Sequence, residues 1–275
     1  MLIELFHLDF FRNALLAGLL VSVVVSFLGV LVVLKRVVFL GAALAEIASA
    51  GLAFGFFLGF SARSQGAIVI AFAVTVAMSL VLALPHRNRI VPQESVVAIG
   101  FVVGTAVALL LVSKSAEGME ELKHILAGHL LTSRPAETLV DLVVFSVLIG
   151  CYLLFHKQIL YVSFDPESAQ SVGLVTRRWN MVFYLLLGLA IAQAIRSAGT
   201  LLVVSYLVLP ATGALLATRR LRTAHLLAVG LGAAGTVAGL VASFTWDVPP
   251  SAAIVLALAF LTGLCLVVSY RRPQG

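Results

Sequence analysis

One acidic residue, Glu46, lies inside a long apolar run of this sequence. The run begins near Val37, so nine residues of helix would place the Glu46 carboxylate about 14 Å deep in a bilayer. Inserting an acid at the bilayer centre costs about 2.5–3.5 kcal/mol. We therefore expect Glu46 either to face a water-filled path or to hydrogen-bond, as a neutral acid, to a neighbouring helix.

A second acidic residue, Asp247, stands in the sequence SFTWDVPPSA between two apolar runs. Asp close to Pro is common in turns, so the residues alone favour a structural role. Gln193 and Arg196, at the end of another apolar run, are candidate partners for the Asp247 side chain. His124 and His129 are five residues apart, a spacing that does not put both imidazoles on one helix face, so we predict no two-histidine metal site.

The composition requires a lipid environment for most of the chain. Of 275 residues, 61% are hydrophobic and 11% are charged, and the mean hydropathy is +1.13. A soluble domain of this size cannot bury that much apolar surface. We expect an all-α, multi-pass bundle of about eight or nine membrane helices, forming one domain over residues 1–275. The expected segments are 13–34, 37–60, 66–84, 95–113, 136–155, 179–195, 199–218, 224–244 and 251–270.

The positive charges indicate how these segments are oriented. Twelve of the eighteen Lys and Arg residues fall on one side of a nine-span arrangement, and this side should be cytoplasmic. The N-terminus is then outside and the C-terminus inside; eight spans would put both termini on one side. The short segments 179–195 and 199–218 are candidates for a broken or tilted helix. Because the basic residues are not clustered on one element, we expect no nucleic-acid binding.

Small residues and cysteines add two expectations. Small residues leave one face of segment 41–51 nearly free of large side chains, and four glycines recur from residue 230 to residue 239. Such faces predict close helix–helix contact in a membrane. Cys151 and Cys265 both lie in apolar runs, which argues against a disulfide or a thiolate metal site.

The sequence SFDPESAQSVG, at residues 163–173, predicts a short helix on the cytoplasmic side. Asp165 is a good N-cap, and Pro166 suits the first helical position. Glu167 places a negative charge at the positive end of the helix dipole, and Gly173 can adopt the left-handed conformation that ends the helix. The segment either contacts something in the cytoplasm or simply joins two spans.

Two catalytic motifs are absent. The sequence contains no G-x-x-x-x-G-K-[ST] phosphate-binding loop and no H-E-x-x-H zinc motif. The chain therefore cannot itself hold ATP in such a loop, and the missing zinc motif argues against an intramembrane protease.

Four segments together resemble the permease subunits of bacterial ABC importers for zinc, manganese and iron, over residues 15–268. GTLLVVSYLVLPATGALLATRR, from Gly199, is similar to a segment of that family, as are Asp247 and Pro249 before the last span. LKRVVFLGAALAEIASAGLAFG resembles the family's first inner loop and second span. DPESAQSVGL resembles the family's D-x-E-x-A-x-x-x-G coupling segment at Asp165, Glu167, Ala169 and Gly173.

The resemblance implies a metal-type permease fold in the cytoplasmic membrane and a homodimer. It further implies a separate ATPase subunit that binds ATP, so that this chain needs no cofactor and is not an enzyme by itself. It also implies an extracellular binding protein that delivers the ion. Asp165, Glu167, Ala169 and Gly173 would then contact the ATPase, while Glu46 and Asp247 would lie on the cation path.

One departure from the family pattern bears on the cargo. The family usually has G-D-x-x-x-H in the second span; here Gly41 is kept, Ala42 replaces the Asp and Glu46 replaces the His. A single carboxylate is a weaker and less selective metal ligand than that pair. Alternatives are a non-metal cargo, export, or a proton-coupled secondary transporter that uses Glu46. The sequence leaves the ion and the direction of transport open.

Overall fold

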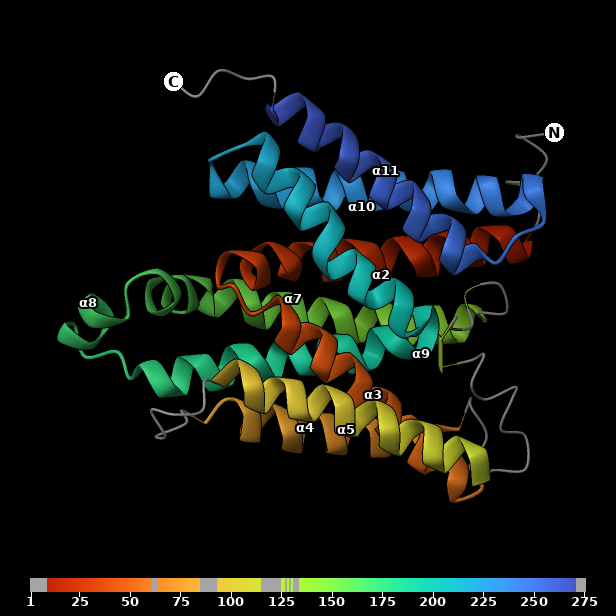
Figure 1. Cartoon of the computed structure of the whole chain (residues 1–275), viewed down its shortest axis with the longest axis horizontal. Coiled ribbons are helices and arrows are strands. Elements are labelled where there is room, and N and C mark those ends of the chain that lie inside the picture. Colours follow the sequence, from red (N-terminus) through yellow and green to blue (C-terminus); the bar gives the residue numbers. More distant parts are fainter. Residues whose placement is uncertain are drawn as a thin grey trace. The chain divides into compact units, whose positions relative to one another are not determined.

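The computed structural model describes residues 9–60, 64–84, 93–114, 125–126, 128, 130 and 134–270. The long elements in this part of the chain are helices, which Figure 1 labels. His124, His129 and most of the apolar stretch 122–131 lie outside the described residues. The helices are α2 (Asp9–Leu34), α3 (Val38–Phe57), α4 (Gln65–Leu82), α5 (Gln93–Lys114), α7 (Pro135–Phe164), α8 (Pro166–Ser171), α9 (Thr176–Ala217), α10 (Leu221–Trp246) and α11 (Pro250–Tyr270).

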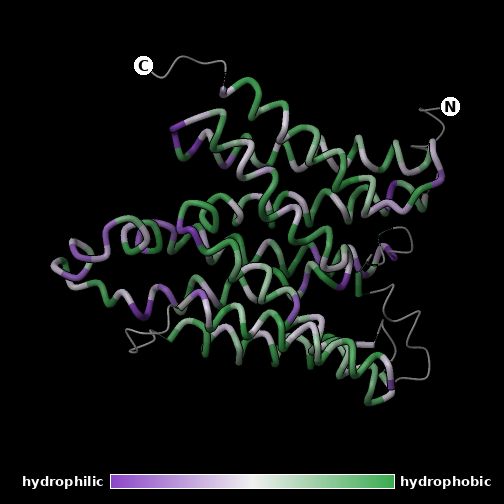
Figure 2. The backbone as a smooth tube through the Cα atoms, viewed as in Figure 1, coloured by the Kyte–Doolittle hydropathy of each residue, from purple (hydrophilic) through white to green (hydrophobic). Residues whose placement is uncertain are grey.

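Eight of these helices are long and apolar enough to cross a membrane, which confirms the expected multi-pass helical fold. All nine expected segments correspond to these helices, because α9 accounts for two. With 42 residues it is about twice as long as a span requires, and it is interrupted at Gly199 (φ 78°, ψ 164°). Figure 2 shows hydrophobic residues along the long helices and hydrophilic residues around α8.

The chain divides into two compact units, and both α7 and α9 contribute residues to each. The first unit comprises Met1–Val38, Leu126–Val143 and Ala194–Gly275; the second comprises Phe39–Ile125 and Val144–Gln193.

In the first unit, α10 packs against both α2 and α11. Tyr206 of α9 is fully buried, and its hydroxyl lies 2.5 Å from the Thr236 hydroxyl of α10. Thr236 donates its proton to the Gly232 carbonyl at 2.8 Å, so Tyr206 is the donor to Thr236. Apolar helices without a hydrophobic driving force between them depend on such contacts and on close packing.

In the second unit, glycines bring α3 and α4 into backbone contact. A Cβ atom placed on Gly51 or Gly55 would lie 2.7 Å from the Cα atom of Ala71 or Ala67, respectively. Fourteen of the twenty residues of α3 are buried. The close contact expected from the small residues of this segment is therefore confirmed.

Candidate functional site

Glu46 lies on the least buried stripe of α3. Ala42 and Glu46 are only partly buried, and at four residues apart they share one face of the helix. Gly104 of α5 lies against the backbone of Glu46, since a Cβ added to Gly104 would be 3.2 Å from the Glu46 carbonyl carbon. The absence of that side chain lets α5 approach α3 closely and places the next residue, Thr105, beside the Glu46 carboxyl group.

The Thr105 hydroxyl is shared between two oxygen atoms. Its oxygen lies 3.0 Å from Glu46 Oε2 and also 3.0 Å from the Phe101 carbonyl oxygen. Thr105 has one hydroxyl proton, so it can donate to an ionised Glu46. Alternatively, it donates to the Phe101 carbonyl and accepts a hydrogen bond from the protonated carboxyl group of a neutral Glu46. The same contact therefore suits both charge states of the carboxyl group.

Asp247 ends α10 in a left-handed conformation (φ 51°, ψ 46°) that Asp tolerates better than most residues. The backbone N–H of Asp247 donates to the Ser243 carbonyl, and the Ser243 hydroxyl donates to the Val248 carbonyl at 2.6 Å. The Asp247 side chain is exposed. Its predicted turn chemistry is therefore present. Asp247 belongs to the first unit and Glu46 to the second.

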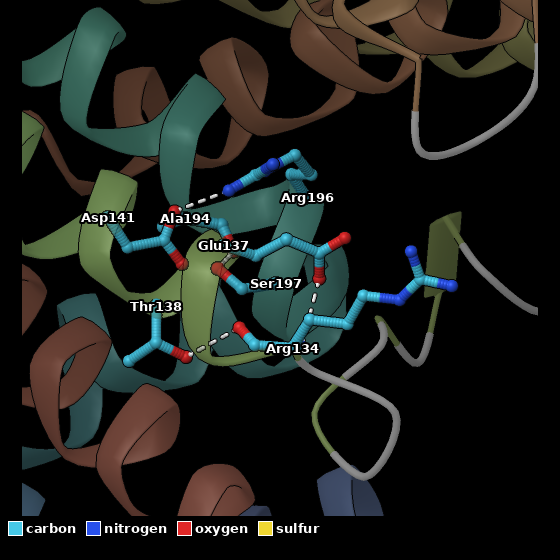
Figure 3. Close-up of polar contacts among 7 residues, drawn as sticks. All are labelled: Arg134, Glu137, Thr138, Asp141, Ala194, Arg196 and Ser197. Carbon is cyan, nitrogen blue, oxygen red and sulfur yellow. Dashed lines mark hydrogen bonds and ion pairs between the residues drawn. The ribbon is translucent and has the colours of Figure 1, made fainter.

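Arg196 pairs with a residue that the sequence reasoning missed. Arg196 Nη2 lies 2.6 Å from Asp141 Oδ1, and Asp141 is only 1% exposed (Figure 3). The structure pairs Arg196 with Asp141 of α7, a partner that the sequence suggestion of Asp247 did not include. The sequence did contain a sign of this pair, because Asp141 is an isolated acidic residue in the apolar run 136–155. An ionisable residue inside a membrane span indicates a functional position, as it does for Glu46.

Metal-ligand side chains are sparse around these positions. No group of three or more His, Cys, Asp or Glu side chains suited to a metal occurs among the described residues. Cys151 and Cys265 are free thiols. At the Ala42–Glu46 stripe, the structure brings two oxygen donors together, the Glu46 carboxylate and the Thr105 hydroxyl.

The α8 segment has the ends predicted from its sequence. Asp165 Oδ1 accepts a hydrogen bond from the Ser168 N–H at 3.0 Å, and Pro166 occupies the first turn. Gly173 is left-handed (φ 84°), and its N–H donates to the Gln170 carbonyl at 3.0 Å. The Leu174 N–H donates to the Ala169 carbonyl at 2.9 Å, which completes a Schellman motif.

The surroundings of α8 suit contact with another protein. The side chain and backbone of Ser168 hydrogen-bond to the Asp165 carboxylate and hold its pKa below the ordinary value. Glu167 is exposed, whereas Ala169 is buried. Three apolar side chains beside the segment are exposed, and Figure 1 shows α8 beyond the adjoining ends of α7 and α9. These side chains are Phe164, Val172 and Val175.

Comparison with known proteins agrees with this helical architecture. The manganese import system permease protein ScaB of Streptococcus gordonii is 30% identical over 97% of this chain and 94% of its own length. The manganese transport system membrane protein MntC of Listeria monocytogenes is 26% identical over 94% and 90% of the two chains. A chain from the structure of PsaBC from Streptococcus pneumoniae in complex with Fab has a TM-score of 0.84 at 24% identity, covering 97% of this chain and 95% of its own.

The eight apolar helices and these matches define a multi-pass permease of the cell membrane. A family model, the ABC 3 transport family, matches residues 7–269. The chain therefore belongs to the ABC 3 transport family, as the resemblance of its motifs predicted.

Proposed function

We propose that this chain is the permease subunit of an ABC importer for a divalent metal ion, with manganese as the first candidate. The observation that carries the proposal is the Glu46 carboxyl group on the partly exposed stripe of α3, in contact with Thr105. An acid inside a span has a cost that a passing cation would offset. The names of the similar proteins from Streptococcus gordonii and Listeria monocytogenes support manganese as the cargo.

The donor atoms at this stripe favour a hard cation. Carboxylate and hydroxyl oxygens suit Mn²⁺, whereas imidazole and thiolate are the donors that favour Zn²⁺. Glu46 stands where the family pattern has a His, so the imidazole is replaced by an oxygen donor. Two copies of the chain would bring two Glu46 carboxylates to one path, where their like charges would repel each other until a cation neutralises them. Such a site binds weakly enough to release its ion.

The proposed assembly contains two copies of this chain acting as one membrane domain, a separate ATPase and an extracellular binding protein. ATP is bound by the ATPase, and this chain holds no cofactor of its own. We assign Asp165, Glu167, Ala169 and Gly173 to the contact with the ATPase, because they shape the capped helix α8. Closure of the ATPase would then move α8 and bias the spans between two states.

Asp247 is assigned to the outer mouth of the path. Its side chain is exposed at the end of α10, where a negative charge attracts a cation. Asp247→Asn keeps the shape and tolerates the left-handed backbone, so this change isolates the contribution of the charge.

Uptake of radioactive Mn²⁺ by cells expressing the intact transporter tests the proposal. Glu46→Gln removes the charge at nearly constant volume and should lower uptake by about tenfold or more, with unchanged amounts of protein in the membrane. Glu94→Gln, at the exposed start of α5, removes an equal charge away from the Ala42–Glu46 stripe and should transport normally. Normal uptake by the Glu46→Gln variant would remove the main support for a cation path at this stripe.

A further inference from the structure

The interruption of α9 has a backbone conformation that requires glycine. At φ 78° and ψ 164°, Gly199 occupies a region that other residues almost never enter. A break of this kind exposes backbone groups that a continuous helix would pair, and inside a membrane it is tolerated only where protein or water surrounds it. Such strain persists only where neighbouring residues hold the backbone in place.

Gly128 supplies one of these restraints. It is itself left-handed (φ 71°) and lies against the peptide bond before Gly199. A Cβ on Gly128 would be 2.4 Å from the Ala198 carbonyl carbon and 2.5 Å from the Gly199 nitrogen. The backbone at Gly128 therefore touches the break directly, and a side chain at this residue would prevent the contact.

The Asp141–Arg196 pair supplies the second restraint. Arg196 is three residues before Gly199, and its guanidinium group contacts a carboxylate that is almost fully buried. The start of α7, which carries Asp141, is itself fixed (Figure 3). The Glu137 carboxylate accepts a hydrogen bond from the Arg134 N–H at 3.2 Å, and the Thr138 hydroxyl donates to the Arg134 carbonyl at 3.3 Å.

A buried ion pair contributes little net stability compared with apolar side chains of similar volume, because both charges lose their hydration. Stability alone therefore does not explain a charged pair at this place. A buried charged pair can instead favour the one conformation in which its two partners meet over conformations in which they are apart. Its attraction also falls steeply when water enters, since the interaction energy varies inversely with the local dielectric constant.

We propose that Asp141 and Arg196 are positioning residues that hold the α9 break at Gly199 in one of two arrangements, and that this contact opens and closes during transport. The proposal rests on the transport role given above. It assigns the pair a part in the conformational cycle rather than in cation binding, so its loss should slow transport without changing the affinity for the ion. Gly128 fixes the same break through its backbone.

The test replaces both charges with apolar side chains, Asp141→Leu with Arg196→Met, in the full transporter. Because no unpaired charge remains, this double variant should insert in normal amounts. We expect the maximal rate of Mn²⁺ uptake to fall by about tenfold or more, with an unchanged KM. If the double variant inserts poorly, Asp141→Asn with Arg196→Gln provides a neutral pair that can still hydrogen-bond, and the same fall in rate is expected. A normal maximal rate in an inserted double variant would overturn the proposal.

A second measurement does not depend on transport. The change Ser197→Cys introduces a thiol at a buried position beside the break, in a chain whose Cys151 and Cys265 are replaced by Ala. We expect the reaction of this introduced thiol with a water-soluble maleimide to be several-fold faster when the ion pair is removed. Equal labelling rates with and without the pair would mean that the pair does not hold the break. Absence of Mn²⁺ uptake by the parent protein, with faster labelling of the double variant, would instead count against the proposed cargo alone.

Discussion

At the scale of single residues, the Thr105 hydroxyl determines how the Glu46 carboxyl group is held. With one proton and two acceptors within 3.0 Å, it can stabilise either the ionised or the neutral acid. A cation that approaches Glu46 would displace a proton from the acid or compete for a carboxylate already oriented by Thr105. In the conformation described, the Thr105 hydroxyl can therefore hydrogen-bond to either charge state of Glu46.

Thr105→Val tests this role, because it keeps the branched shape and removes the hydroxyl. Hydrogen bonds to charged groups are worth about 1.5–3 kcal/mol, so we expect the KM for Mn²⁺ to rise roughly tenfold. Thr105→Ser restores the hydroxyl and should transport as the parent does. The measurement is the concentration dependence of uptake, and equal KM values for all three proteins would exclude the hydroxyl from the path.

Metal preference should follow the donor atoms at residues 42 and 46. Ala42→Asp with Glu46→His recreates the Asp and His of the family pattern on the same face of α3. Since imidazole suits Zn²⁺ better than a second carboxylate does, we expect uptake of Zn²⁺ relative to Mn²⁺ to increase severalfold. Competition between the two ions in one uptake assay measures the ratio. An unchanged ratio would show that selectivity is set elsewhere.

At the scale of elements, α8 depends on its two ends, because Ala169 is its one buried residue. Asp165→Ala removes the acceptor for the Ser168 N–H, whereas Asp165→Asn keeps one. We expect Asp165→Ala and Gly173→Val to lower ATP-driven uptake severalfold with normal insertion, and Asp165→Asn to have little effect. Full uptake by both Asp165→Ala and Gly173→Val would show that α8 only connects α7 and α9.

The pH dependence of the same cap has a definite sign. Hydrogen bonds from Ser168 lower the pKa of Asp165, so the charged cap stabilises α8 above the pKa of the unfolded chain. That contribution disappears as the pH falls through the lowered pKa of the folded state. We therefore expect the coupling of ATP hydrolysis to uptake in reconstituted vesicles to be constant between about pH 5 and 8, as far as Asp165 determines it. If coupling instead falls within this pH range, and the Asp165→Asn variant does not show that fall, Asp165 changes its charge there and the prediction is wrong.

The contact of α3 with α4 depends on the absence of side chains. Gly55→Val would place its Cβ within 2.8 Å of atoms of Ala67, whereas Gly150 in α7 has no atom within 4 Å of an added Cβ. Overpacking of this kind typically costs about 1–3 kcal/mol. We expect Gly55→Val to lower the thermal stability of the purified protein by several degrees and Gly150→Val to leave it nearly unchanged. Equal melting temperatures would mean that α3 and α4 separate without cost.

Sequence reasoning succeeded where the signals were local. The positions of the apolar helices follow from runs of residues, and the ends of α8 follow from Asp165, Pro166 and Gly173 within a dozen positions. The partner of Arg196 could not be obtained in this way, because Asp141 is 55 residues away in sequence and its proximity depends on tertiary packing. The contact of Thr105 with Glu46 spans 59 residues and depends on Gly104.

At the scale of the whole molecule, the distribution of Lys and Arg predicts the orientation. The side with twelve basic residues, which includes the C-terminus, should remain in the cytoplasm. Of two reporters fused after Gly275, the one that works in the cytoplasm should therefore be active and the one that works in the periplasm should not. Fusions of a periplasmic and a cytoplasmic reporter at the same position provide the comparison. Activity of the periplasmic reporter would contradict nine spans with the N-terminus outside and would favour an even number.

The uninterrupted length of α7 has a mechanical consequence. Its 30 residues extend over about 45 Å, which exceeds the hydrocarbon thickness by about 15 Å. The helix starts about 1.7 turns before Asp141 and ends immediately before Asp165. Because its backbone hydrogen bonds run along the axis, a continuous helix resists stretching more than a loop of the same length does. On the proposed function, α7 therefore gives a continuous helical connection from α8, which the ATPase would contact, to the residues around Asp141.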